Sequence, residues 1–195
     1  MITSYKVTLR NRIGSSMLMN SPKAMIEASD DPGGVTTKKK YDDEEEAKIR
    51  LYETDKGELY IPSVAFRASL LNGCKGRRIG KKAATTVVSG AVFCVGDKCI
   101  LTDPDTGKTL MAGKSSKDGD YKLHKTRAVV GRAAVPRVRP EIENWQAEVE
   151  FEIDTDFVSD TMINDLLDIA GRVAGILDWR PEKKGPHGRY QVVEK

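Results

Sequence analysis

The sequence predicts an α+β fold in which strands and helices follow one another in the order βαββαβ. Two segments alternate apolar and polar residues as half-buried strands do, at 2–10 and 145–153. Two others have the apolar spacing of amphipathic helices, at 63–72 and 159–173, and a last strand is expected at 190–193. This order is typical of the ferredoxin-like (RRM-like) plan, an antiparallel sheet with both helices on one face.

The length and the charge distribution of the chain limit its possible functions. A chain of 195 residues is long enough for one hydrophobic core, so we expect a single domain over 1–195. The net charge is only +3, but an acidic run at 41–46 contrasts with basic stretches at 38–40, 75–82 and 122–139. Such segregation favours a polyanionic partner at particular surfaces.

Nothing in the sequence predicts membrane insertion. No apolar run approaches the length of a membrane span, and the first residues lack the layout of a secretion signal. We therefore expect a soluble, cytoplasmic protein that makes no membrane contact.

After the first strand, residues 12–57 are expected to form a loop insertion. Prolines, glycines and the charge runs dominate it, so only short helical or strand pieces are predicted, near 21–26 and 48–52. Pro62 and Ser63 then start the first helix, and Gly73 ends it.

The β-branched and aromatic residues of 85–101 predict strands on either side of a turn at Gly96 and Asp97. A hairpin there would place Cys94 and Cys99 opposite each other. A disulfide or half of a metal site is conceivable, and we favour two reduced cysteines.

A second insertion is expected over 104–140. Its first part, up to 120, is rich in Gly, Ser, Lys and Asp and reads as an exposed loop, whereas 121–139 interleaves valines with cations. We interpret this part as a hairpin arm that projects from the body. An ordinary edge hairpin with solubilising charges is the alternative.

The segment 175–192 is the most informative, because it is a basic, glycine-punctuated loop between the last helix and the last strand. Gly185 and Gly188 allow positive φ and close backbone approach, and cations that could bind phosphate surround them. Trp179 offers a face on which a base could stack, although we favour a core position for it.

The first helix adds a second place for phosphate. Its amino-terminal amides can receive an anion, and Lys75, Arg77, Arg78, Lys81 and Lys82 follow directly after it. An ordinary capped amphipathic helix explains the apolar positions equally well. It does not explain so many cations beyond the helix.

Three segments resemble the RAMP superfamily, the ferredoxin-like proteins that form the backbone of CRISPR effector complexes. Residues 60–71 resemble its helix start, 175–192 its carboxy-terminal glycine-rich loop, and 12–16 its first loop. Ser63-Val64-Ala65 replaces the usual Gly-Ser-Ser, and Trp179-Arg180-Pro181 departs from a purely glycine-rich loop. The pieces 178–181 and 185–190 are also similar to proteins of bacteriophages and mobile elements.

The resemblance implies an RNA-binding backbone subunit of a CRISPR-like ribonucleoprotein. Such a subunit coats guide or other single-stranded RNA, wedges a hairpin thumb between base pairs, and assembles into a filament or a multi-subunit complex. The arm at 121–139 is the candidate thumb. Together with the basic surfaces, the resemblance gives these candidate RNA-binding residues: Arg12, Ser63, Arg67, Lys75, Arg77, Arg78, Lys81, Lys122, Lys125, Arg127, Arg132, Arg137, Arg139, Trp179, Arg180, Lys183, Lys184, His187 and Arg189.

Catalysis is a separate hypothesis, which we do not favour. Some relatives cleave target RNA with an aspartate after the first strand, and the resemblance makes Asp30 and Asp31 weak candidates here, although Asp-Asp-Pro-Gly-Gly is also turn chemistry. His124 and His187 are too few and too far apart in sequence to predict an acid–base pair or a zinc site, and we expect each to contact a phosphate or a base, or simply to be exposed. We expect neither a metal ion nor a cofactor, and residues 76–81 do not have P-loop spacing.

Two alternatives remain open at this point. One is a metal-dependent endoribonuclease of the same fold. The other is a phage accessory protein that binds single-stranded DNA or another protein through the same surface, which RNA and DNA of one sequence would distinguish.

Overall fold

The computed structural model describes residues 1–23, 42–130 and 133–193. Over these residues the protein has the α+β class that the sequence predicts, with antiparallel sheets and helices. The main sheet has the strand order β11-β1-β10-β7-β3, with β6 also paired to β10. Its strands are β1 Ile2–Asn11, β3 Tyr60–Pro62, β6 Val92–Cys94, β7 Lys98–Thr102, β10 Gln146–Asp154 and β11 Tyr190–Val192.

The two long central strands pair antiparallel, from Ile2 opposite Asp154 to Arg10 opposite Gln146. Their alternation works as predicted, because Val149, Phe151 and other inward residues of β10 are buried while glutamates alternate with them on the outer face. That outer face carries Glu148, Glu150 and Glu152 and is acidic.

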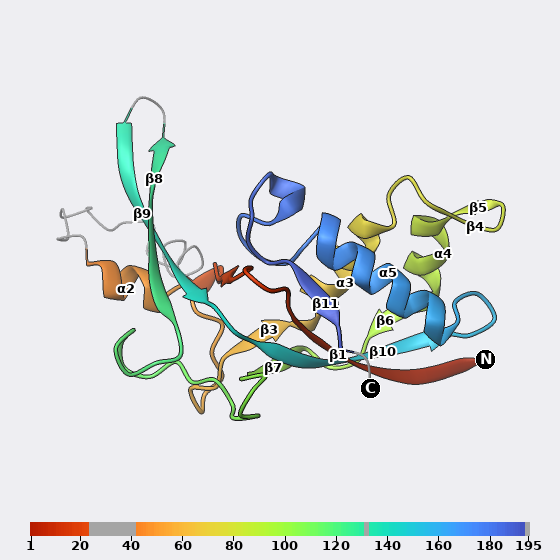
Figure 1. The fold of residues 1–195 in the computed structure, drawn as a ribbon, viewed down its shortest axis with the longest axis horizontal. Helices are drawn as coiled ribbons and strands as arrows, with labels where there is room; N and C mark the ends of the chain where they lie inside the picture. Colours follow the sequence, from red (N-terminus) through yellow and green to blue (C-terminus); the bar gives the residue numbers. More distant parts are fainter. Residues whose placement is uncertain (24–41, 131–132, 194–195) are drawn as a thin grey trace, which may run out of the picture.

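Helices α3 (Ser63–Gly73) and α5 (Asp160–Val173) lie side by side on one face of this sheet (Figure 1). A Cβ on Gly73 would lie 2.6 Å from the Cα of Ala170, so a glycine at this position permits the close approach of the two helices. Phe66 packs edge to face against Tyr190, at 5.8 Å between ring centroids, and both side chains are fully buried. The core therefore lies between the sheet and these helices.

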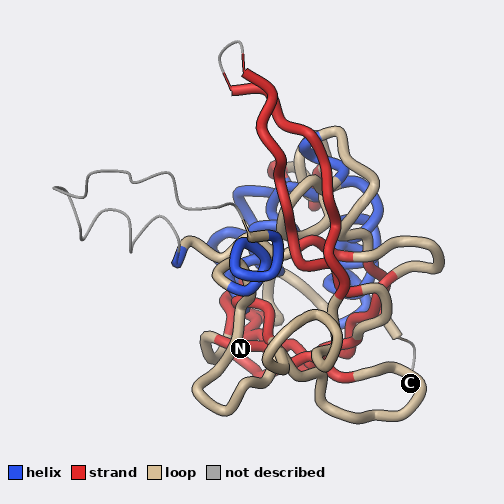
Figure 2. Tube along the Cα trace, turned by 90° about the vertical axis from the view of Figure 1, so that its left-hand side faces the viewer, coloured by secondary structure: helices blue, strands red, loops and turns tan. Residues whose placement is uncertain are grey.

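The predicted arm is a hairpin of β8 (Lys122–Val130) and β9 (Ala133–Ile142), which projects from the body (Figures 1 and 2). The short strand β2 (Met17–Leu18) pairs with the base of β9 and joins the hairpin to the start of the chain. Helix α2 (Asp43–Lys48) packs against the other side of the hairpin, and the side chain of Asp42 caps its amino terminus. The insertion predicted at 12–57 therefore includes helix α2 within its acidic run. The sequence pattern did not predict a helix at this position.

The prediction of strand at 85–101 is wrong for its first part. Helix α4 (Ala84–Ala91) forms there, and its Ala84, Val88 and Ala91 are buried. Tertiary burial of this apolar stripe outweighs the β-propensity of the Thr and Val residues. A small hairpin of β4 (Arg78–Ile79) and β5 (Lys82–Ala83) leads into the helix.

Gly96 and Asp97 do not connect two strands of a hairpin. Both β6 and β7 pair antiparallel with β10, so they are one strand interrupted by a bulge over 95–97. The bulge covers the start of α3, because Ser63 donates its hydroxyl to the carbonyl of Gly96 at 2.5 Å and its N–H to that of Asp97 at 3.0 Å. Cys94 and Cys99 are thus not hairpin partners, and burial raises the pKa of Cys99 to about 12.

Candidate nucleic-acid interface

The C-terminal loop, defined here as residues 174–189, turns back on itself between α5 and β11. Ile176 donates its N–H to the carbonyl of Gly188, and Gly188 donates to that of Ser16. Gly188 has φ +71°, and a Cβ there would lie 2.1 Å from the carbonyl oxygen of Ile176, so only glycine fits. Gly185 is needed for a different reason, since its φ is not positive but its Cβ would meet the carbonyl oxygen of Trp179 at 1.8 Å.

Three residues with side chains have positive φ in this loop: Leu177 (59°), Trp179 (46°) and Lys184 (61°). The 3-10 turn Pro181–Lys183 lies between the last two. Such backbone costs about 1–3 kcal/mol per residue and persists where the surroundings fix it. The Trp179 side chain is 43% exposed, which contradicts the expected core position.

The hairpin presents one face to this loop. Pairing places Lys122 opposite Glu141, His124 opposite Arg139 and Thr126 opposite Arg137, so these side chains share a face. Val138, on the opposite face, is 1% exposed, on the side where α2 packs. The register thus places Arg137 and Arg139 of β9 on the side of the C-terminal loop, whereas Arg127, opposite Pro136, belongs to the same face as Val138.

Between hairpin and loop lies a groove of ≈ 610 Å³, which we call the basic groove. Arg127, Arg137 and Arg139 line it from the hairpin, and Trp179, Arg180 and Lys183 line it from the loop. The remaining lining residues are Leu18, His124, Thr126 and Asp178. Six residues proposed from sequence for RNA contact, drawn from two distant segments, are thereby brought together.

Asp178 joins the two walls of the groove. Its carboxylate accepts from Arg137 Nη2 at 2.5 Å and from Arg139 Nε at 2.9 Å. Burial alone would raise the pKa of Asp178, but the hydrogen bond from Arg139 and the charges of both arginines lower it overall. The carboxylate therefore offsets part of the positive charge of these two guanidinium groups.

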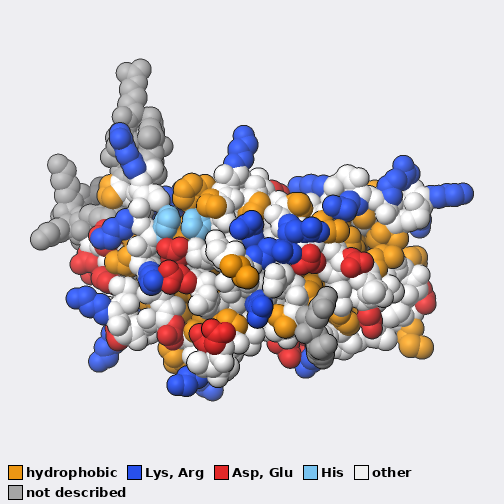
Figure 3. Space-filling view, in the orientation of Figure 1, with side chains coloured by type: hydrophobic (Ala, Val, Ile, Leu, Met, Phe, Trp, Pro, Cys, Tyr) orange, Lys and Arg blue, Asp and Glu red, His pale blue; other side chains and the backbone are white. Residues whose placement is uncertain are grey.

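His124 and His187, the two histidines of the chain, are far apart in the sequence but lie next to each other beside the groove (pale blue in Figure 3). Their ring centroids are 5.0 Å apart, and that of His187 lies 5.4 Å from Trp179. Ser16 Oγ lies 2.5 Å from Glu141 Oε1 and 2.8 Å from His187 Nδ1, while His124 Nδ1 lies 3.4 Å from Glu141 Oε2. The cluster joins three separate parts of the chain, since His124 and Glu141 belong to the hairpin, Ser16 to the first loop and His187 to the C-terminal loop.

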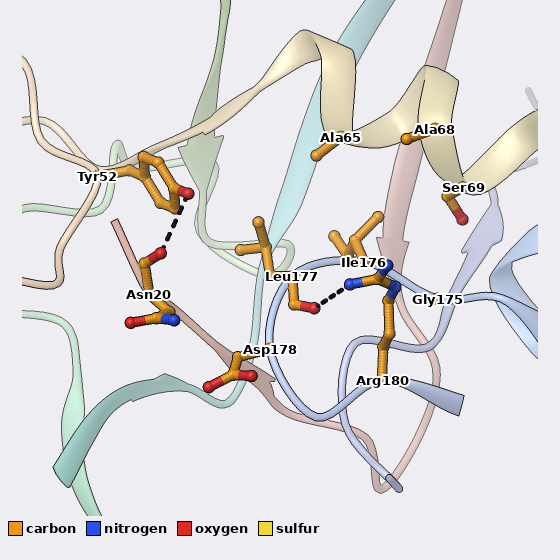
Figure 4. A pocket seen from close by; sticks show the side chains of 10 residues that line it. All are labelled: Asn20, Tyr52, Ala65, Ala68, Ser69, Gly175, Ile176, Leu177, Asp178 and Arg180. Carbon is orange, nitrogen blue, oxygen red and sulfur yellow. Dashed lines mark hydrogen bonds between the residues drawn. The ribbon is translucent and has the colours of Figure 1, made fainter. Parts of the chain in front are cut away.

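A smaller pocket of ≈ 310 Å³ lies on the other side of the loop's first turn (Figure 4). Small side chains of α3, Ala65, Ala68 and Ser69, form one wall of it. The Tyr52 hydroxyl donates to the carbonyl of Asn20 at 3.3 Å at its far end. Asp178 and Arg180 line both hollows, so the turn at 175–180 separates the pocket from the basic groove.

Three predicted contact residues are engaged within the protein. Arg12 bonds the carbonyl of Tyr190 and pairs with Asp168 at 2.6 Å, which fixes the first loop to α5. Arg67 donates to the carbonyls of Val92 and Ser89 and lies 5.0 Å from the centre of the Phe93 ring. Ser63 is 1% exposed beneath the bulge. These three side chains do not line the basic groove.

The remaining cations fall into separate sets. Lys75, Arg77, Arg78 and Lys81 are exposed around the β4–β5 hairpin, and Lys75 reaches Glu182 of the C-terminal loop at 3.3 Å. Lys122 pairs with Glu143 at 2.6 Å and Lys125 with Asp43. Lys184 is exposed, and the Nε of Arg189 is buried without a hydrogen-bond partner. Arg132, Asp30 and Asp31 lie outside the described residues.

Within the described ranges, no group of three or more His, Cys, Asp or Glu side chains could hold a metal ion. No helix in the same ranges is long and apolar enough to cross a membrane. No protein-family model matches the chain, and no curated protein matches it either.

Proposed function

We propose that the protein binds single-stranded RNA as a subunit of RAMP type, with the basic groove as the main contact surface. The observation that carries the proposal is the convergence of Arg127, Arg137, Arg139 and Lys183 on one groove beside an exposed Trp179. Cations hold phosphates, and an indole face stacks on any base, which are the two needs of single-strand binding.

The acidic outer face argues against binding on the open sheet. RRM domains stack bases on that face, but here Glu148, Glu150 and Glu152 alternate along β10. Lys6 offsets part of this charge by pairing with Glu148 and Glu150, and the remaining negative charge would repel a phosphate chain. The proposed RNA path therefore runs along the helix side, between the hairpin and the C-terminal loop, with the exposed cations of the β4–β5 hairpin as an extension.

The finer fold assignment belongs to the same proposal. The partial order β11-β1-β10-β6, with α3 before β6 and α5 before β11, is the observation that supports a ferredoxin-like arrangement. With the β8–β9 hairpin as the thumb, we propose a cytoplasmic ribonucleoprotein subunit that assembles with copies of itself or with other subunits along the RNA.

The test is binding of a fluorescein-labelled 20-nucleotide single-stranded RNA, measured by anisotropy at several salt concentrations. Replacing Arg127, Arg137 and Lys183 together by Ala should flatten the plot of log K against log salt by about two units, since each contact to a single strand contributes ~0.7. Trp179→Ala should cost about 1–3 kcal/mol of binding free energy.

Matched controls come from exposed lysines away from the groove. Lys56, Lys108 and Lys117, replaced together by Ala, should leave the salt slope nearly unchanged. Equal losses in the two triple variants would disprove the groove assignment. DNA of the same sequence decides the native ligand, and tighter binding of DNA than RNA would favour the accessory-protein alternative.

A further inference from the structure

We propose that His124 and His187 form a proton-linked phosphate site, so that RNA binding takes up protons and tightens as the pH falls. This inference rests on the proposed function and names how the basic groove is regulated. It follows from how the two rings are held, from what surrounds them, and from an imidazole nitrogen that has no partner in the protein.

The first step is the orientation of the rings. A carboxylate only accepts hydrogen bonds, so Ser16 donates its single hydroxyl proton to Glu141 Oε1. His187 Nδ1, 2.8 Å from the same hydroxyl oxygen, must then carry a proton and donate it to Ser16. His124 Nδ1 faces the other oxygen of Glu141. Glu141 thus orients the His124 ring directly and the His187 ring through Ser16, in both cases at Nδ1, so a phosphate would bind at Nε2.

The second step is the unsatisfied nitrogen. His124 Nε2 is buried and has no hydrogen-bond partner, and the His124 side chain lines the basic groove. A buried polar atom without a partner costs about 1–3 kcal/mol. Once the ring carries a proton on both nitrogens, Nε2 can donate to a phosphate oxygen, which would relieve that cost. The neighbouring cations Arg127, Arg139 and Lys183 are the groups that would hold such a phosphate.

The third step is the charge balance. The groups that face the histidines are Glu141 and Arg139 of β9, Asp178 of the C-terminal loop and Ser16 of the first loop. Asp178 is paired with Arg137 and Arg139, so Glu141 is the carboxylate whose charge a phosphate beside neutral imidazoles would meet. Protonated imidazoles remove that repulsion and donate to the phosphate from Nε2.

The sign of the coupling follows from these charges. In the free protein, burial and then the neighbouring His124 lower the pKa of His187, against the opposite effect of Glu141 and Asp178. His187 is therefore mostly neutral near pH 7. A bound phosphate favours the charged form of His187 and raises its pKa, so a proton binds together with RNA and affinity increases below neutral pH.

The experiment measures the dissociation constant of the labelled RNA between pH 5.5 and 8 at constant ionic strength. We expect binding to tighten about tenfold across this range for each unit by which the bound phosphate raises a histidine pKa. Titration calorimetry at pH 6.5, in two buffers of different ionisation enthalpy, should report net proton uptake on binding.

The variants separate histidine protonation from general electrostatics. His124→Gln and His187→Gln, singly and together, keep a hydrogen-bonding side chain without a titratable ring and should flatten the pH dependence. Lys183→Gln, in the same groove, should weaken binding at every pH and keep the wild-type pH slope. Near-ultraviolet circular dichroism checks that each variant is folded.

Each outcome has a distinct meaning. A wild-type affinity independent of pH overturns this inference and leaves the proposed function standing. A pH slope that persists in the double Gln variant overturns the assignment to these two histidines. Absence of RNA binding at every pH overturns the proposed function, and this inference with it.

Discussion

Asp178 has two opposing effects on the protein. It stabilises the fold through its hydrogen bonds with Arg137 and Arg139, and it neutralises guanidinium groups that a phosphate would otherwise contact. Asp178→Asn should lower the free energy of unfolding by about 1–3 kcal/mol, because Arg139 is only 12% exposed and loses its charge partner. Urea unfolding measures this loss.

The same variant should bind RNA more tightly at low salt. Freed guanidinium charge adds up to one phosphate contact, which would steepen the salt slope by ~0.7. Binding is measured at a temperature below the unfolding transition, so that the lower stability of the variant does not affect the measured affinity. Weaker binding by a fully folded Asp178→Asn protein would contradict the view that the carboxylate competes with phosphate.

His187 gives a pH prediction for the RNA-free protein. Its pKa is lowered in the folded state, chiefly by burial and then by His124, so the unfolded chain binds the proton more readily. The contribution of neutral His187 to stability is therefore complete above its unfolded value of about 6.5 and is lost as the pH falls below it. Melting temperatures from pH 5 to 8 should show a decline at acidic pH that is smaller in His187→Gln.

Residue chemistry alone could not predict this histidine cluster. The basic and glycine residues of the C-terminal loop are evident in the sequence, and six predicted contact residues do line one groove. The pairing of His124 with Arg139 depends on hairpin register, and the exposure of Trp179 depends on how the C-terminal loop folds. Local composition predicts neither property.

At the scale of elements, the crossing of α3 and α5 depends on Gly73. Because a Cβ there would lie 2.6 Å from both Cα and Cβ of Ala170, Gly73→Ala should push the helices apart and destabilise the protein by about 1–3 kcal/mol. Gly90→Ala is the matched control, since nothing lies within 4 Å of a Cβ there in α4. It should be neutral or stabilising by up to about 1 kcal/mol. Equal effects in urea unfolding would refute the packing argument.

Strands and helices with strong hydrophobic periodicity could be predicted from the sequence. Elements whose secondary structure depends on tertiary contacts could not. The alternation of β10 and the apolar stripe of α5 match their predicted types. Helix α4 was missed because its Thr and Val residues prefer strands, and burial of one face outweighs that preference. The bulge at 95–97 has a turn sequence, but only the pairing of both flanking strands with β10 distinguishes it from a hairpin.

For the whole molecule, we expect RNA to cover one side only. Lys183 lines the basic groove, whereas Lys6 lies on the acidic face, where it pairs with Glu150 at 3.5 Å. Acetylation footprinting by mass spectrometry should show Lys183 protected by RNA and Lys6 unaffected. Protection of Lys6 would mean that the strand crosses the sheet, and protection of Lys81 would extend the path to the β4–β5 hairpin.

The basic groove has one wall from the β8–β9 hairpin and the other from the loop after α5, and these walls meet through Asp178. A ligand that contacts both walls acts as a non-covalent cross-link between a projecting arm and the body. Opening of the hairpin base then requires release of the ligand. Amide hydrogen exchange in 122–127 and 136–142 should consequently slow when RNA is bound, while exchange in α4 stays constant.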